Sequence, residues 1–130
     1  MQARQLLLIA TIALATLPSH AQTRQVSLKS GESADIGAVY WVKNCQSSLK
    51  KITGVDVLEG DAAGLQLSVR EEPVQATRQN CPEKVPGGVV VVSTGAVQEK
   101  RSTLIKYRVR YDTLDGLQQS THTVSVDLFP

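Results

Sequence analysis

Two stretches near the C-terminus alternate polar and apolar residues with a period of two, and they constrain the fold more than any other part of the chain. Over residues 104–111, aliphatic or aromatic residues alternate with mostly basic ones, and over residues 121–128 valine and leucine alternate with threonine, serine and aspartate. This alternation is typical of a strand with one face on a core and the other in water. We therefore expect two long strands that share one buried face.

The residues between these strands indicate a tight hairpin. Asp115 and Gly116 are suited to the two central positions of a type I′ turn, where both residues need a positive φ. A shift of one residue would turn every apolar side chain to the wet face, so the pattern also constrains the register. With Asp115 and Gly116 as the turn, the predicted cross-strand pairs are Leu114 with Leu117, Tyr107 with Val124, Ile105 with Val126, and Arg108 with Thr123.

The N-terminus has the pattern of a secretory signal peptide. Arg4 precedes an apolar run over residues 6–17, and small residues at Ser19 and Ala21 offer a cleavage site after Ala21. The run is shorter than the ~20 residues that a spanning helix needs, which argues against the alternative of a membrane anchor. We predict a signal peptide over residues 1–21 and one exported domain over residues 22–130, periplasmic or secreted, with no membrane span in the mature chain.

The charge of the predicted mature chain is nearly balanced. Removal of residues 1–21 takes only Arg4 from the basic residues, leaving 13 basic against 12 acidic. A nucleic-acid-binding domain usually has a strong excess of basic residues. We therefore expect no nucleic-acid partner.

Two cysteines, Cys45 and Cys81, remain in the mature chain. An even number of cysteines in an exported protein indicates a disulfide, and the spacing matches neither a Cys-x-x-Cys redox motif nor a zinc site. Closing a loop of this length would stabilise the fold by ~3–4 kcal/mol. A redox pair or a pair of metal ligands is the functional alternative.

The rest of the mature chain also has the pattern of β-structure. Strand-like stretches cover residues 25–29, 36–43, 52–58 and 65–70, and residues 89–92 form a run of valines that fits a strand covered on both faces. No stretch has apolar residues at helical spacing. About seven strands with frequent turns predict an all-β fold, an antiparallel β-sandwich.

This pattern resembles the immunoglobulin-like domains of small secreted bacterial proteins. The resemblance covers the mature chain and rests on the strand number, the tyrosine-rich terminal hairpin, and Trp41 close to Cys45. Trp41 precedes the first cysteine, whereas in antibody domains the tryptophan lies between the two cysteines. We expect Trp41 to point inward and its neighbour Tyr40 to the opposite side.

The residues for common catalytic chemistry are missing from the sequence. It has no Gly-x-Ser-x-Gly motif. His122, the only histidine of the mature chain, is expected opposite Val109 in a structural role. No His/Cys cluster indicates a metal site, and Asp56, Glu59 and Asp61 do not have the spacing of a calcium loop. We expect neither an enzyme nor a cofactor.

One group of charged residues favours binding. A Cys45–Cys81 disulfide would bring together five basic residues that flank the two cysteines: Lys43, Lys50, Lys51, Arg78 and Lys84. Binding sites are commonly built on loops that a rigid scaffold holds in place. The function predicted is a binding or accessory module for an anionic partner, either another envelope protein or an anionic glycan. The alternatives are lysines that only keep the loops soluble, and a structural subunit or oligomer assembled through a sheet edge that would contain residues 89–92.

The sequence also predicts a second basic row. Lys106, Arg108 and Arg110 alternate along one predicted strand, where they would form its water-facing side, with Asp127 partly balancing their charge.

Overall fold

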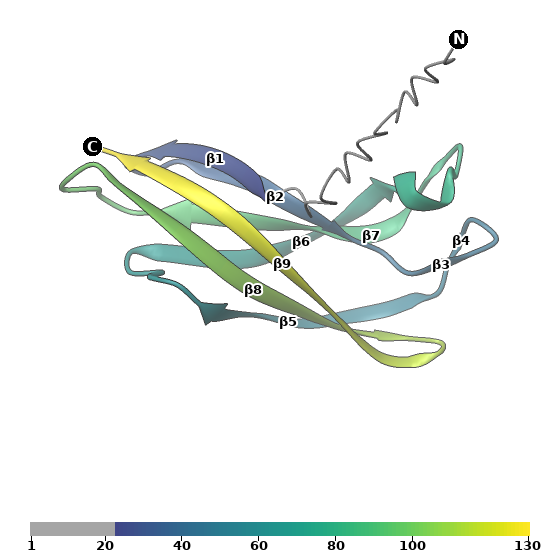
Figure 1. Cartoon of the computed structure of the whole chain (residues 1–130). Helices are drawn as coiled ribbons and strands as arrows, with labels where there is room; N and C mark the ends of the chain where they lie inside the picture. Colours follow the sequence, from purple (N-terminus) through teal and green to yellow (C-terminus); the bar gives the residue numbers. More distant parts are fainter. Residues whose placement is uncertain (1–22) are drawn as a thin grey trace, which may run out of the picture.

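The computed structural model describes residues 23–130, and these form an all-β structure without an α-helix (Figure 1). The predicted signal peptide, residues 1–21, lies outside the described residues. A single turn of 3₁₀-helix, η1 (Thr77–Gln79), interrupts the strands. The strands are β1 (Arg24–Lys29), β2 (Ser33–Val39), β3 (Val42–Lys43), β4 (Gln46–Ser47), β5 (Leu49–Glu59), β6 (Leu65–Gln75), β7 (Lys84–Thr94), β8 (Arg101–Thr113) and β9 (Gly116–Phe129).

Two larger sheets form two layers around a common core. One sheet has the strand order β1-β9-β8-β5 and the other β2-β7-β6, while β3 and β4 form a small hairpin at one end (Figure 1). All neighbouring strands are antiparallel except β1 and β9, which run parallel. The expectation of a wholly antiparallel structure is therefore wrong at the first strand. The chain's start pairs with its end, a contact that no local pattern indicates.

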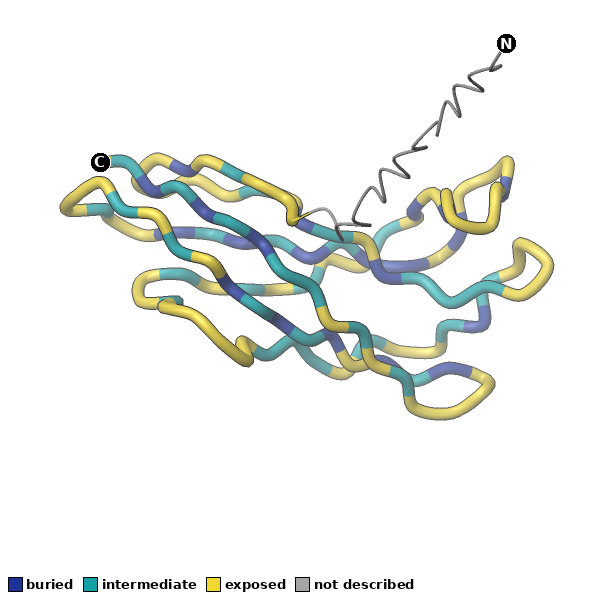
Figure 2. The backbone as a smooth tube through the Cα atoms, in the orientation of Figure 1, coloured by how far each residue is buried: buried dark blue, intermediate teal, exposed yellow. Residues whose placement is uncertain are grey.

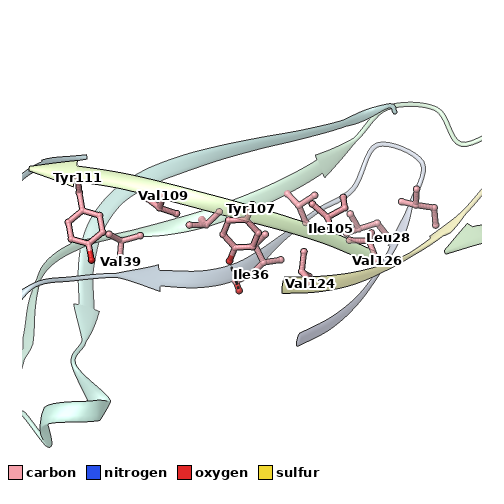
Figure 3. Close-up of a cluster of buried hydrophobic side chains, with 12 residues drawn as sticks. Leu28, Ile36, Val39, Ile105, Tyr107, Val109, Tyr111, Val124 and Val126 are labelled. Atoms are coloured by element: carbon pink, nitrogen blue, oxygen red, sulfur yellow. Dashed lines mark hydrogen bonds between the residues drawn. The ribbon is translucent and has the colours of Figure 1, made fainter. Parts of the chain in front are cut away.

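The main core lies between the two layers (Figure 3). The alternation along β8 and β9 turns one side of each strand inward, as predicted, and Figure 2 shows buried segments alternating with exposed ones along these strands. β2 and β7 supply the opposing side chains. The most deeply buried large residues are Tyr107, Leu28, Ile105, Leu128, Val90, Val92, Val109, Val124 and Val126.

The hairpin between β8 and β9 has the predicted faces but not the predicted register. Tyr107 pairs with His122 and Ile105 with Val124, so the strands are shifted by two residues from the expected pairing. The reason is the turn, in which only Gly116 has a positive φ, of 103°. Leu114 and Asp115 are its central residues, as in a type I turn followed by a glycine. A shift of two residues keeps every side chain on its predicted face.

The corrected pairs replace each of the predicted ones. In the observed register Arg108 is opposite Thr121, Val109 is opposite Ser120, and Thr113 is opposite Gly116. Thr113 stabilises the turn, because its hydroxyl accepts a hydrogen bond from the Asp115 amide at 3.1 Å and donates one to the Gly116 carbonyl at 2.8 Å.

The valine run of residues 89–92 lies in β7, the central strand of the three-stranded sheet. Val90 and Val92 are buried in the main core, while the outer side chains of Val89 and Val91 are half-buried. The guanidinium of Arg70 on β6 reaches Asp35 on β2 at 3.2 Å, and so crosses the outer face of β7. The expectation that residues 89–92 form an exposed sheet edge is therefore wrong.

Cys45 and Cys81 form the predicted disulfide, with Cα atoms 5.4 Å apart. The bond connects the tip of the β3–β4 hairpin to the segment after η1, and both lie at the same end of the molecule as the β8–β9 turn (Figure 1). Trp41 packs against the main core and its neighbour Tyr40 against a second one, so they face opposite sides as predicted. The second core lies beside the disulfide and contains Val74, Ala76, Cys81 and Val85.

Candidate functional site

Lys43, the first of the five predicted basic residues, is paired with an acid. Its ammonium nitrogen lies 2.6 Å from Asp115 Oδ1, and Trp41 Nε1 donates a hydrogen bond to Oδ2 of the same carboxylate at 2.9 Å. These two contacts hold the pKa of Asp115 below its usual range, with the Lys43 hydrogen bond as the larger cause. Lys43 therefore anchors the β8–β9 turn, a contact between segments that sequence analysis did not connect.

Lys50 and Lys51 lie at the start of β5, on a cleft of about 290 Å³ that also contains acids. Glu71 and Glu72 of β6 line the same cleft. Glu72 accepts a hydrogen bond from Arg70, which lowers the pKa of Glu72, and the charge of Lys84 adds a smaller effect in the same direction. The three lysines therefore belong to a region of mixed charge.

Arg78, the last of the five, lies in η1 on a different cleft, of about 110 Å³. None of the carboxylates of residues 23–130 forms an ion pair with Arg78. The disulfide holds its loop in place, because Cys81 follows Arg78 by three residues. The cleft is lined by Ala38, Val39, Tyr40, Trp41, Arg78, Gln79, Tyr111, Ser120 and His122.

A second cleft, of about 380 Å³, adjoins the first along β9. His122 lines both clefts, so the two clefts are neighbours along β9, and we refer to the pair as the β9 groove. It carries three cations, Arg24, Arg78 and Lys106, and no aspartate or glutamate lines it. The residues of the second cleft are Thr23, Arg24, Ile36, Lys106, Thr121, His122 and Thr123.

Titratable groups in and under the groove are affected by these cations. Burial lowers the pKa of His122, and the charge of Arg78 lowers it further, and both effects favour the neutral imidazole. Burial raises the pKa of Tyr111, against smaller opposing effects of a Ser120 hydrogen bond and Arg78. Burial also raises the pKa of Tyr107 to about 12, and the charge of Arg24 opposes that rise. The charge of Arg78 therefore acts on His122 and Tyr111, which line the groove, and the charge of Arg24 acts on Tyr107 beneath it.

The chemistry of the β9 groove suits the binding of an anion. Exposed cations that lack acidic partners can pair with a carboxylate or phosphate without first breaking an internal ion pair. The rings of Tyr40, Trp41 and Tyr111 add amphipathic contact area beside Arg78. His122 lies against the ring of Tyr107, with ring centroids 5.6 Å apart.

The second predicted basic row is only partly free. Arg108 and Arg110 approach the same carboxylate, Asp56, at 3.7 and 2.9 Å. Lys106 has no such partner within the described chain and lines the β9 groove. Asp127, expected to balance the row, accepts a hydrogen bond from Ser102 instead.

Two of the acids considered for calcium are paired with arginines. Asp56 contacts Arg110, and Asp61 lies 3.1 Å from Arg101. Residues 23–130 contain no group of three or more His, Cys, Asp or Glu side chains placed to hold a metal ion.

Sequence analysis missed Arg24 and Lys106 as members of a site. They come together with Arg78 because β1 pairs with β9, and because Lys106 on β8 pairs with Thr123 on β9. The β1–β9 contact has no local signal, because the two strands are 100 residues apart in the sequence. Lys106 lies on the predicted hairpin, but its position near Arg24 depends on the β1–β9 contact. The described residues include no helix long and apolar enough to cross a membrane. Comparison of the chain with protein-family models, curated proteins and solved structures finds no match.

Proposed function

We propose that the protein is a non-enzymatic, exported binding module that holds an anionic partner in the β9 groove. One observation carries this proposal: Arg24, Arg78 and Lys106 line the groove and no acid lines it. The other predicted cations do not share this property, because Lys43 is paired with Asp115 and the remaining lysines lie among glutamates. The groove is therefore where an incoming negative charge is best accommodated.

Export to an oxidising compartment, the periplasm or the cell exterior, is supported by two features. The Cys45–Cys81 disulfide is of a kind that persists outside the cytosol. The pattern of residues 1–21 independently indicates a secretory signal.

An immunoglobulin-like sandwich is the fold that we propose for this module. The order β2-β7-β6 corresponds to strands B, E and D of an immunoglobulin domain, and β5-β8-β9 corresponds to strands C, F and G. The seven strands of the two larger sheets agree with that assignment. Binding through residues at one edge and one end of such a sandwich is common for this architecture.

Two variants with the same change in net charge test the proposed site. The first combines Arg24→Gln, Arg78→Gln and Lys106→Gln, and the second combines Lys50→Gln, Lys51→Gln and Lys84→Gln. Each is titrated against poly-glutamate and against a polyuronate at low salt. Three surface contacts of about 0.5 kcal/mol each sum to about 1.5 kcal/mol, which predicts a loss of roughly tenfold in affinity for the first variant. The second should bind like the unmodified protein.

The two variants separate the rival explanations. An equal loss in both would show that only net charge matters and would overturn the assignment of the groove. A larger loss in the second would move the site to the lysines near the β5–β6 cleft. Raising the salt should weaken binding of the unmodified protein, because exposed charge contacts are screened.

A further inference from the structure

β9 has one edge that is only partly occupied. On one edge β8 pairs with residues 116–128, whereas β1 pairs only with residues 124–129 on the other edge. No strand within residues 23–130 pairs with residues 116–123 on that second edge. Backbone N–H and C=O groups point alternately to the two edges of a strand. The open edge therefore offers a row of hydrogen-bonding groups.

This open edge lacks the features that protect edge strands. Proteins commonly block an edge with charged residues, proline or a bulge. Residues 116–123 of β9 contain no charged residue and no proline. Their pairing with β8 is regular throughout.

The other edges of the two larger sheets do have protective features. β5 carries Lys50 and Lys51 and three irregularities in its pairing. β6 contains Pro73, β2 has a bulge near Asp35, and β1 carries the charged residues Arg24 and Lys29. Residues 116–123 are therefore the stretch best suited to accept another strand.

The open edge and the cations occupy the same place in the molecule. Ser120, Thr121, His122 and Thr123 belong to the open stretch of β9 and also line the β9 groove. A strand added there would direct alternate side chains toward the groove. An acidic side chain on that strand would meet Arg78 or Arg24.

We propose that the partner is a protein that binds by adding an extended, acidic segment as a strand along residues 116–123 of β9. This inference rests on the proposed function, because it identifies the anionic partner as a polypeptide. Backbone pairing would supply the affinity, and the groove would select for acidic side chains. The N-terminal end of β1 would limit the added strand, since β1 occupies the edge from residue 124 onward.

The probe for this proposal is a capped synthetic peptide that alternates serine and valine and carries one glutamate. Two control peptides are matched to it. In one, glutamine replaces the glutamate, and in the other, consecutive residues are N-methylated, which removes amide donors from both edges of the peptide. Trp41 is the only tryptophan of the chain and lines the groove, so its fluorescence reports binding to the exported protein.

We expect the acidic peptide to bind, and to slow amide hydrogen exchange at alternate residues between 116 and 123. N-methylation should abolish binding. The glutamine peptide should bind several-fold more weakly than the acidic peptide. Arg78→Gln should lower the affinity for the acidic peptide and leave the affinity for the glutamine peptide unchanged.

The failures of the two proposals are distinguishable. Equal binding of the N-methylated peptide would overturn strand addition and leave anion binding in place. A second outcome is that N-methylation abolishes peptide binding, while neither Arg78→Gln nor replacement of the glutamate changes it. That outcome would support strand addition at the open edge and overturn anion binding in the groove. Binding of a uronate oligosaccharide without binding of the acidic peptide would overturn the polypeptide assignment in favour of a glycan.

Discussion

The hydroxyl of Tyr107 occupies the space that Gly37 leaves open on the opposite sheet. A Cβ atom at Gly37 would lie 2.8 Å from this hydroxyl. The same hydroxyl donates a hydrogen bond to the Ile36 carbonyl at 3.4 Å, and Tyr107 is only 1% exposed. The phenol of Tyr107 on β8 therefore fits against β2 because Gly37 has no side chain.

We expect Gly37→Ala to destabilise the fold by about 1–3 kcal/mol, because the added methyl group would overlap the hydroxyl of the buried Tyr107. Tyr107→Phe alone should cost about 1 kcal/mol through the lost hydrogen bond. The double variant should be less destabilised than the sum of the two, because removal of the hydroxyl makes room for the methyl group. Denaturant unfolding of the four proteins measures the coupling, and strict additivity would contradict the steric explanation.

Tyr107 should also make stability depend on alkaline pH. Its pKa is raised by burial to about 12, whereas in the unfolded chain it ionises near its ordinary value of about 10. The unfolded state therefore loses its proton first, and stability should fall by about 2–3 kcal/mol as the pH rises from about 10 to 12. Unfolding experiments across this range should show a smaller decrease for Tyr107→Phe. An unchanged decrease would assign the effect to other groups.

His122 should make the free energy of unfolding decrease as the pH falls into the acidic range. Burial and Arg78 lower its pKa in the folded protein below the ordinary value of about 6.5. Between these two values the unfolded state binds more protons, so stability is full above about pH 6.5 and decreases as the pH falls through the lower, folded value.

Two variants separate the causes of that acid dependence. His122→Gln should abolish the part that belongs to the imidazole. Arg78→Gln should reduce it without abolishing it, because burial is the larger cause of the pKa shift. An NMR titration of the His122 ring measures the shift directly, and an ordinary pKa in the unmodified protein would refute the prediction.

Removing the disulfide should destabilise the protein by about 2–5 kcal/mol. Combining Cys45→Ala and Cys81→Ala releases the β3–β4 hairpin from the second core, which includes Cys81 itself. We also expect no reactive thiol in the unfolded, unreduced protein, because both cysteines are bonded. Two titratable thiols would contradict the bond, and an unchanged melting temperature of the double variant would contradict its stabilising role.

The alternation along β8 and β9 predicted their buried faces correctly, because each side chain's face depends only on parity within its own strand. The register depended on which residues formed the turn. Asp115 and Gly116 were expected at its centre, but Leu114 and Asp115 lie there and Gly116 follows them. The carboxylate of Asp115 also contacts Trp41 and Lys43 from another part of the chain, and tertiary contacts of this kind leave no local pattern in a sequence.

The candidate site was predictable only in part for the same reason. Arg78 was identified because it lies three residues from a cysteine, and the pairing of two cysteines required no knowledge of the fold. Arg24 lies at the groove because β1 pairs in parallel with β9, for example Gln25 with Ser125. The paired residues of these two strands are 100 positions apart in the sequence. A regular pattern within each strand carries no information about which distant strand it will contact.

The parallel pairing of β1 with β9 also sets an order in time. β1 contacts residues 124–129, which are synthesised 100 residues after it. Contacts of such long sequence separation slow folding. β1 therefore stays without its sheet partner until residues 124–129 have been made, so this edge of the four-stranded sheet is among the last parts of the fold to form.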